Sequence, residues 1–125
     1  RIGLIPDVGG TYFLPRAMGL AKAIGSSIFA DKIMAAEAHE IGLIYEYVED
    51  DNYDIHLKSR VEYLANGPTV AFAGIKTAMR KSLNNSLDEQ LELEAKLQKK
   101  CGNTRDFQEG VLAFHEKRDA KFEGR

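Results

Sequence analysis

Apolar side chains recur at helical spacing along most of this 125-residue sequence. Residues 54–65 carry one such stripe, and residues 68–83 carry a second with four members: Phe72, Ile75, Met79 and Leu83. A third stripe, in residues 104–117, consists of Phe107, Val111 and Phe114. Because side chains three or four positions apart share one face of an α-helix, these stripes predict a mainly α chain of about five helices.

Capping signals place the ends of several helices. Ser86 and Glu89 form an S-x-x-E capping box ahead of the segment QLELEAKLQKK, and such a pair satisfies two backbone N–H groups at a helix start. Gly42 follows a short helical pattern over residues 35–41. It should close that helix, because glycine readily adopts left-handed backbone. The last helix is expected over residues 104–117.

The N-terminal part of the chain is less regular. Thr11 follows two glycines and is a candidate N-cap, whereas Pro15 should interrupt the segment that follows it. We therefore expect a short first turn and then a helix from about Pro15. The apolar residues 2–5 and the segment LIYEYV at residues 43–48 favour short strands. The expected fold contains at most one or two strands.

Composition excludes several classes of protein. The formal net charge is −2, so the chain lacks the basic footprint of a nucleic-acid-binding protein. No apolar run approaches the roughly 20 residues that a membrane span needs. The single Cys101 excludes an internal disulfide and favours a reducing compartment, for which we expect the cytoplasm, with the mitochondrial matrix as the alternative. His39 and His56 have no further ligands at metal-binding spacing, so no metal site is expected.

The opening stretch RIGLIPDVGGT places a carboxylate in a rigid corner. An apolar run leads straight into a turn, as in a core element without its beginning, and we expect that residue 1 is not the native start. Pro6 fixes the backbone before Asp7, while Gly9 and Gly10 keep bulk away so that a ligand can come close. Asp7 could therefore serve chemistry, or it could cap the turn and the following helix. The local sequence alone favours capping.

Four segments follow one another with consistent spacing: RIGLIPDVGGTYFLPRAMGLAKA, AAEAHEIGLIYEYVED, LANGPTVAFAGIK and TRDFQEGVLAFHEKRDAKFEGR. Together they resemble the enoyl-CoA hydratase/isomerase family, the crotonase superfamily. The first is similar to the family pattern G-L-x-P-D-x-G-G-T-x-x-L-P-R-x-x-G. The last is similar to D-x-x-E-G-x-x-A-F-x-E-K-R-x-x-x-F.

The resemblance implies the C-terminal helical part of the crotonase (ClpP/crotonase-like) fold. Residues 1–11 would end a truncated spiral core and carry the active-site turn, and residues 12–125 would form a helical oligomerisation region. The family's N-terminal half, a spiral of βββα turns with the oxyanion hole, would lie upstream of Arg1. The 125-residue chain alone is therefore expected to be inactive.

The resemblance also implies roles for five residues. Asp7 matches the position where several isomerases of the family carry a catalytic aspartate, with Pro6 and Gly9 beside the bound substrate. Phe114 and Lys117 match residues that contact the pantetheine and phosphate parts of CoA, often from a neighbouring subunit. Without the resemblance, these two would be read as the edge of an amphipathic helix, with Phe114 buried and Lys117 solvated.

The implied activity is enolate chemistry on an acyl-CoA thioester, with proton transfer by a carboxylate. CoA belongs to the substrate, so no separate cofactor is expected. An isomerase is favoured over a hydratase, because hydration usually enlists two carboxylates and the sequence offers one. The implied assembly is a homo-oligomer, a trimer or a dimer of trimers. The alternative is the helical oligomerisation module of a non-catalytic relative.

Overall fold

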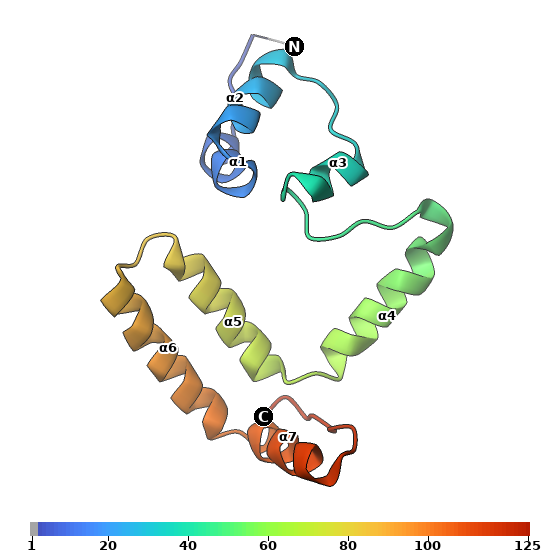
Figure 1. Ribbon diagram of the computed structural model, residues 1–125, viewed down its shortest axis with the longest axis vertical. Helices are drawn as coiled ribbons and strands as arrows, with labels where there is room; N and C mark the ends of the chain where they lie inside the picture. The colour runs from blue at the N-terminus through green and yellow to red at the C-terminus, as the bar shows by residue number, and fades with distance from the viewer. Residues whose placement is uncertain (1–2) are drawn as a thin grey trace. The chain divides into compact units, whose positions relative to one another are not determined.

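The computed structural model describes residues 3–125 and is mainly α-helical, as the apolar stripes predict (Figure 1). About 67% of the chain is helical, and the described residues contain no strand. The elements are α1 (Gly10–Met18), α2 (Leu20–Phe29), α3 (Ala35–Glu40), the 3-10 turn η1 (Asp50–Asn52), α4 (Tyr53–Ala65), α5 (Thr69–Ser82), α6 (Leu87–Gly102) and α7 (Arg105–Glu116). The chain divides after Tyr53 into two compact units, each of which is described by itself.

The first unit is built on α1 and α2, which pack against each other and bury Met18 and Ala23. The sequence prediction for this region was wrong in two respects. Thr11 is not the N-cap, because α1 begins at Gly10 and its N-cap is Gly9. Pro15 does not interrupt the helix either, and lies inside it.

The break between α1 and α2 falls at Gly19 instead. Its backbone has φ 80° and ψ 156°, a region open essentially only to glycine. Pro15 fits a helical φ and forfeits one backbone hydrogen bond, whereas Gly19 turns the chain. The position of the break therefore follows the glycine and not the proline.

The short helix α3 ends as the sequence predicts. Gly42 has φ 77°, and its N–H donates to the carbonyl of His39 at 3.0 Å, while the N–H of Leu43 donates to that of Ala38 at 2.8 Å. These two bonds define a Schellman motif.

The strand expected at residues 43–48 is absent, so that prediction was wrong. The N–H groups of Leu43 and Ile44 both bond to the carbonyl of Ala38, at 2.8 and 3.2 Å. The start of the apolar run is therefore drawn into the end of α3, and no second strand is present among the described residues to pair with the remainder. Residues 3–5 also form no strand, and residue 2 of that expected strand lies outside the described residues.

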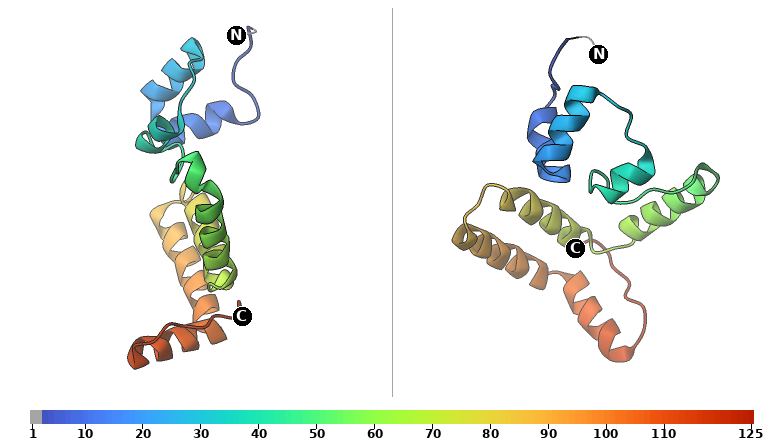
Figure 2. Two further views of the ribbon diagram at one scale, coloured as in Figure 1. Left: turned by 90° about the vertical axis from the view of Figure 1, so that its right-hand side faces the viewer. Right: turned by 45° about the horizontal axis from the view of Figure 1, so that its top comes forward.

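The second unit contains an α5–α6 hairpin, whose helices run side by side in both views (Figures 1 and 2). The capping box at the start of α6 is confirmed, because the Ser86 N–H donates to the Glu89 carboxylate at 2.7 Å and the Glu89 N–H donates to Ser86 Oγ at 3.3 Å. Thr104 Oγ1 caps α7 by accepting from the Phe107 N–H at 3.1 Å. The capping box of α6 was predicted from the sequence, whereas α7 was predicted from its apolar stripe and its Thr104 cap is seen in the structure.

Candidate functional site

A tight turn carries Asp7. The Gly10 N–H donates to the Asp7 carbonyl at 2.8 Å, and the two central residues, Val8 and Gly9, have φ of 50° and 83°. Positive φ at both central positions is the signature of a type I′ turn. The Gly9 carbonyl then accepts from the N–H groups of Tyr12 and Phe13 at 2.9 Å each, so the turn leads directly into α1.

The composition of the turn follows from its geometry. Gly9 is left-handed, and a Cβ there would come within 2.9 Å of the Phe13 ring. A Cβ on Gly10 would come within 2.9 Å of Pro6 Cβ, so a side chain at that position would force the two arms of the turn apart. Val8 also has positive φ, but it lacks the conformational freedom of glycine. A β-branched residue in this conformation is strained. This strain costs on the order of 1–3 kcal/mol, and the surrounding turn must sustain it.

The Asp7 carboxylate is exposed and has no hydrogen-bond or ion-pair partner among the described residues. The capping interpretation required its oxygen to accept an N–H from the first turn of α1. That helix has no side-chain cap, and the backbone carbonyl of Asp7 makes the turn's hydrogen bond instead. The rigid turn therefore presents a carboxylate that the fold of this unit does not use.

An apolar groove of about 490 Å³ lies beside the turn. Pro6 lines it, whereas Asp7 and Gly9 do not. Its walls come from the opening segment, α1 and α2, and their apolar members with side chains are Leu4, Ile5, Pro6, Leu14, Pro15, Leu20, Ala23, Ile24 and Ile28. The groove and the turn together offer an apolar surface adjoining an accessible carboxylate.

Phe114 and Lys117 belong to the second unit. Phe114 is 82% exposed, so the burial expected for it in an amphipathic edge does not occur. Lys117 is the first residue after α7, has φ 54°, and donates its N–H to the Phe114 carbonyl at 3.3 Å. It therefore lies in the left-handed position that glycine usually occupies at a helix end. The predicted site residues therefore belong to two units: Pro6, Asp7 and Gly9 lie in the first, and Phe114 and Lys117 lie in the second.

Phe114 also lines a larger groove, of about 880 Å³, between α5, α6 and α7. Most of its lining is apolar: Val70, Ile75, Ala78, Leu97, Cys101, Phe107, Val111, Phe114 and Phe122. Phe122 reaches it across Gly110, where a Cβ would lie 3.6 Å from the ring. A side chain at Gly110 would therefore be in ordinary van der Waals contact with Phe122.

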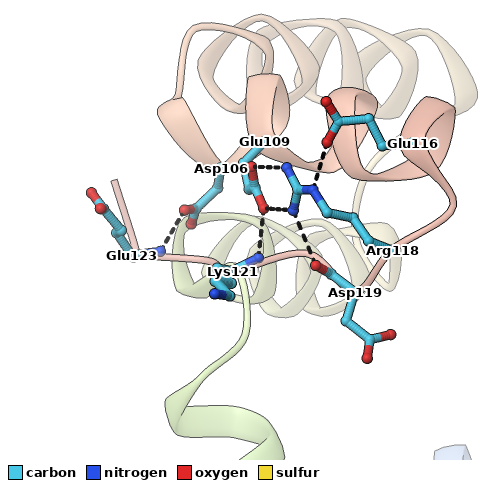
Figure 3. Close-up of polar contacts among 7 residues, drawn as sticks. All are labelled: Asp106, Glu109, Glu116, Arg118, Asp119, Lys121 and Glu123. Atoms are coloured by element: carbon cyan, nitrogen blue, oxygen red, sulfur yellow. Dashed lines mark hydrogen bonds and ion pairs between the residues drawn. The ribbon is translucent and has the colours of Figure 1, made fainter.

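A polar cluster, which we name the C-terminal clamp, binds the segment after α7 back onto that helix (Figure 3). It consists of Asp106, Glu109, Glu116 and Arg118 together with the backbone of residues 119–124. Arg118 donates two hydrogen bonds to Glu109, at 2.6 and 3.0 Å, and one to Glu116 at 2.6 Å. The Arg118 hydrogen bonds lower the pKa of Glu109 to about 2. Arg118 is therefore engaged within the protein.

Sequence reasoning did not find the clamp. Glu109 and Arg118 are nine residues apart and lie on opposite sides of a helix end, so they share no helix face. They meet because the chain reverses at Lys117. The local feature that reverses the chain is the left-handed helix end at Lys117. A lysine does not predict such an end, because glycine usually occupies that position.

Neither a metal site nor a membrane span is found in the part of the chain that the structure describes. No group of three or more histidine, cysteine, aspartate or glutamate side chains gathers there in an arrangement that could hold a metal ion. Within the same residues, no helix is both long and apolar enough to cross a bilayer.

The sequence matches the enoyl-CoA hydratase/isomerase family over residues 1–125. It is 51% identical over its whole length to a Rhodobacter capsulatus protein named "Probable enoyl-CoA hydratase" and 39% identical to the 1,2-epoxyphenylacetyl-CoA isomerase of Escherichia coli K12. A crystal structure of an enoyl-CoA hydratase/isomerase from Cupriavidus metallidurans CH34 superposes on 99% of the chain, with a TM-score of 0.87 and 32% identity.

These matches cover only part of each relative. The chain spans 49% of the Rhodobacter protein, 48% of the Escherichia protein and 47% of the Cupriavidus structure. It therefore corresponds to about half the length of the proteins it resembles.

Proposed function

Because the chain belongs to the enoyl-CoA hydratase/isomerase family, we propose that it is the C-terminal half of an acyl-CoA enzyme in which Asp7 transfers a proton. One observation carries the proposal: the Asp7 carboxylate is held on a rigid turn, exposed, and without a partner among residues 3–125. A carboxylate that stabilises nothing in its own unit is available to a substrate.

The proposed chemistry passes through an enolate. Two backbone N–H groups outside this chain would stabilise negative charge on the thioester oxygen. The proton α to the carbonyl, or at the vinylogous γ position, then becomes acidic enough for a carboxylate to remove. Asp7 would take the proton at one carbon and return it at another, and the apolar groove beside Pro6 is the surface we assign to the acyl chain.

An isomerase is the favoured reaction. Moving a double bond requires one group that shuttles a proton, whereas adding water requires one group to orient the water and a second to deliver the proton. The site offers one carboxylate, Asp7. The names of the relatives include both reaction classes, a probable enoyl-CoA hydratase and an isomerase of an epoxyacyl-CoA. We also propose a cytoplasmic location and a role in fatty acid metabolism.

Phe114 and Lys117 are proposed to contact CoA. An exposed aromatic ring suits the apolar pantetheine arm, and a lysine ammonium suits the 3′-phosphate of CoA as a point charge. No separate cofactor is required, because CoA is part of the substrate.

A homo-oligomer, a trimer or a dimer of trimers, completes the proposal. Large apolar side chains of α5 and α7, among them Ile75, Phe107 and Phe114, are exposed. Contiguous apolar surface of this kind is usually covered by a partner or by a second copy. The same observation supports the alternative function, a helical oligomerisation module of a non-catalytic relative.

Asp7→Asn in the full-length protein tests the catalytic proposal. Asparagine keeps the size of the side chain and tolerates the turn, but it cannot accept a proton at neutral pH. We expect the turnover of a 3-enoyl-CoA to fall by about 100- to 10,000-fold, the usual worth of general acid–base catalysis. The thermal midpoint and the affinity for acyl-CoA should stay nearly unchanged.

The alternative function predicts that the wild-type protein shows no turnover at all. Full activity in the Asn variant would show instead that the protein is an enzyme but that Asp7 does not transfer the proton. Asp31→Asn, on the exposed surface of the same unit, is the matched control and should leave the turnover unchanged.

A further inference from the structure

Lys117 occupies a backbone position that is unfavourable for lysine. Its φ of 54° is left-handed, which costs a residue other than glycine roughly 1–2 kcal/mol. Its ammonium group has no ion-pair partner among the described residues. A strained residue whose side chain contributes nothing to its own fold indicates a function for that side chain.

The residues on both sides of Lys117 are tied to each other. Arg118 Nε bonds to Glu116 at 2.6 Å, so an ion pair spans Lys117 in the sequence (Figure 3). The other end of the Arg118 guanidinium forms a fork with Glu109, at 2.6 and 3.0 Å, and one of its nitrogens also donates to the Asp119 carbonyl at 3.1 Å. A bidentate arginine–carboxylate pair fixes geometry as well as charge.

A second set of bonds holds the chain beyond Arg118. Glu109 also accepts from the Lys121 N–H at 2.8 Å. The two carboxylate oxygens of Asp106 accept from the N–H groups of Glu123 and Gly124 at 2.7 and 3.0 Å, and Asp106 is only 3% exposed. The turn at Lys117 is therefore fixed on its helical side by α7 and on its other side by the clamp.

The clamp also neutralises two negative charges near Lys117. Glu109 and Glu116 are the acidic side chains bound to the residue next to Lys117, and Arg118 satisfies both of them. Without Arg118, either carboxylate would be free to attract the Lys117 ammonium or to repel an incoming anion. With Arg118 in place, the Lys117 ammonium has no ion-pair partner among the described residues.

We propose that Arg118 is a positioning residue that holds the Lys117 turn and keeps Glu109 and Glu116 from competing with a phosphate for the Lys117 ammonium. Arg118 itself does not touch the substrate. The proposal rests on the proposed function, in which Lys117 contacts the 3′-phosphate of CoA. Arg118 would thus strengthen the preference for substrates that carry the 3′-phosphate, although it lies nine residues from Glu109, the residue that it binds.

The test compares two substrates in the full-length protein, an acyl-CoA thioester and the same thioester of 3′-dephospho-CoA. In Arg118→Gln, KM for the CoA thioester should rise about 10-fold with kcat unchanged, since a charge-assisted contact is worth about that factor. The values for the dephospho substrate should not change. Arg118→Lys, which keeps the charge without the fork, should recover part of the preference.

The control is Arg125→Gln, because Arg125 pairs with Glu123 at 2.7 Å in the same segment without adjoining Lys117. It should keep the wild-type preference. An equal loss on both substrates in Arg118→Gln and in Arg118→Lys would show a purely structural role and overturn the inference.

Lys117→Met distinguishes this inference from the function on which it rests. If that variant loses the preference for the 3′-phosphate and Arg118→Gln keeps it, the positioning role alone is wrong. If Lys117→Met keeps the preference, the assignment of Lys117 to CoA is wrong, and the inference falls with it.

Discussion

At the scale of single residues, three of the described residues other than glycine have left-handed backbone: Val8, Ala30 and Lys117. Ala30 ends α2, but the other two adjoin or form a candidate functional position. Val8 is the most strained of the three, because it is β-branched, and it is 95% exposed, so packing does not compensate for the strain. The turn that presents Asp7 is thus maintained at the expense of stability.

Val8→Asn should therefore stabilise this chain. Asparagine tolerates left-handed backbone far better than valine, and the exposed valine loses little burial, so we expect a gain of about 1 kcal/mol in the free energy of unfolding. Urea unfolding followed by circular dichroism measures it. Val61→Asn, in the helical backbone of α4, should bring no gain. A loss of stability in Val8→Asn would show that the valine side chain supports the turn.

At the scale of the helical elements, capping residues determine where helices begin. The Ser86–Glu89 box satisfies the start of α6, and the hydrogen bonds from Ser86 lower the pKa of Glu89 below its usual value of 4.5. A carboxyl group with a lowered pKa stabilises the folded state above its unfolded pKa. That contribution is lost as the pH falls through the folded-state pKa.

Ser86→Ala should lower the free energy of unfolding by about 1 kcal/mol at pH 7, the usual cost of losing an N-cap. The difference between the two proteins should shrink as the pH falls below about 4.5, because protonated Glu89 no longer completes the box. Ser82→Ala is the control, since the Ser82 hydroxyl bonds to a carbonyl at the end of α5. A pH-independent difference in Ser86→Ala would show that the Ser86 hydroxyl does not donate to the Glu89 carboxylate in solution, contrary to the 2.9 Å bond of the structure.

At the scale of the whole molecule, the distribution of apolar side chains predicts association. Few residues are buried within either unit, and Ile75, Phe107 and Val111 in the larger groove remain about half exposed. Such surface is normally covered by another part of a protein or by a second copy.

The 125-residue chain should form a homo-oligomer through α5–α7, and Ile75→Glu should weaken it. Burial of an isoleucine contributes about 1.5–3 kcal/mol, so the substitution should raise the dissociation constant by about 10- to 100-fold. Sedimentation velocity over a concentration series measures the shift. Ile55→Glu, on the exposed surface of α4, should have a smaller effect. A monomer at every concentration of the parent chain would contradict the prediction.

The sequence by itself determined the helices whose signals are local. The capping box of α6, the glycine that ends α3 and the apolar stripes of α5 and α7 each act within one or two helical turns, so they are visible along the chain. The candidate turn at Asp7 was recognisable for the same reason, because proline and glycine constrain the backbone at their own positions.

Tertiary structure decided what depends on partners distant in sequence. The run at residues 43–48 has strand-forming residues, but a strand needs a neighbour to receive its hydrogen bonds, and the described residues provide none. Glu109 and Arg118 meet only because the chain reverses at Lys117 and returns along α7. Periodicity records which residues share a face of one element, and it carries no information about which side chains meet when the chain folds back on itself.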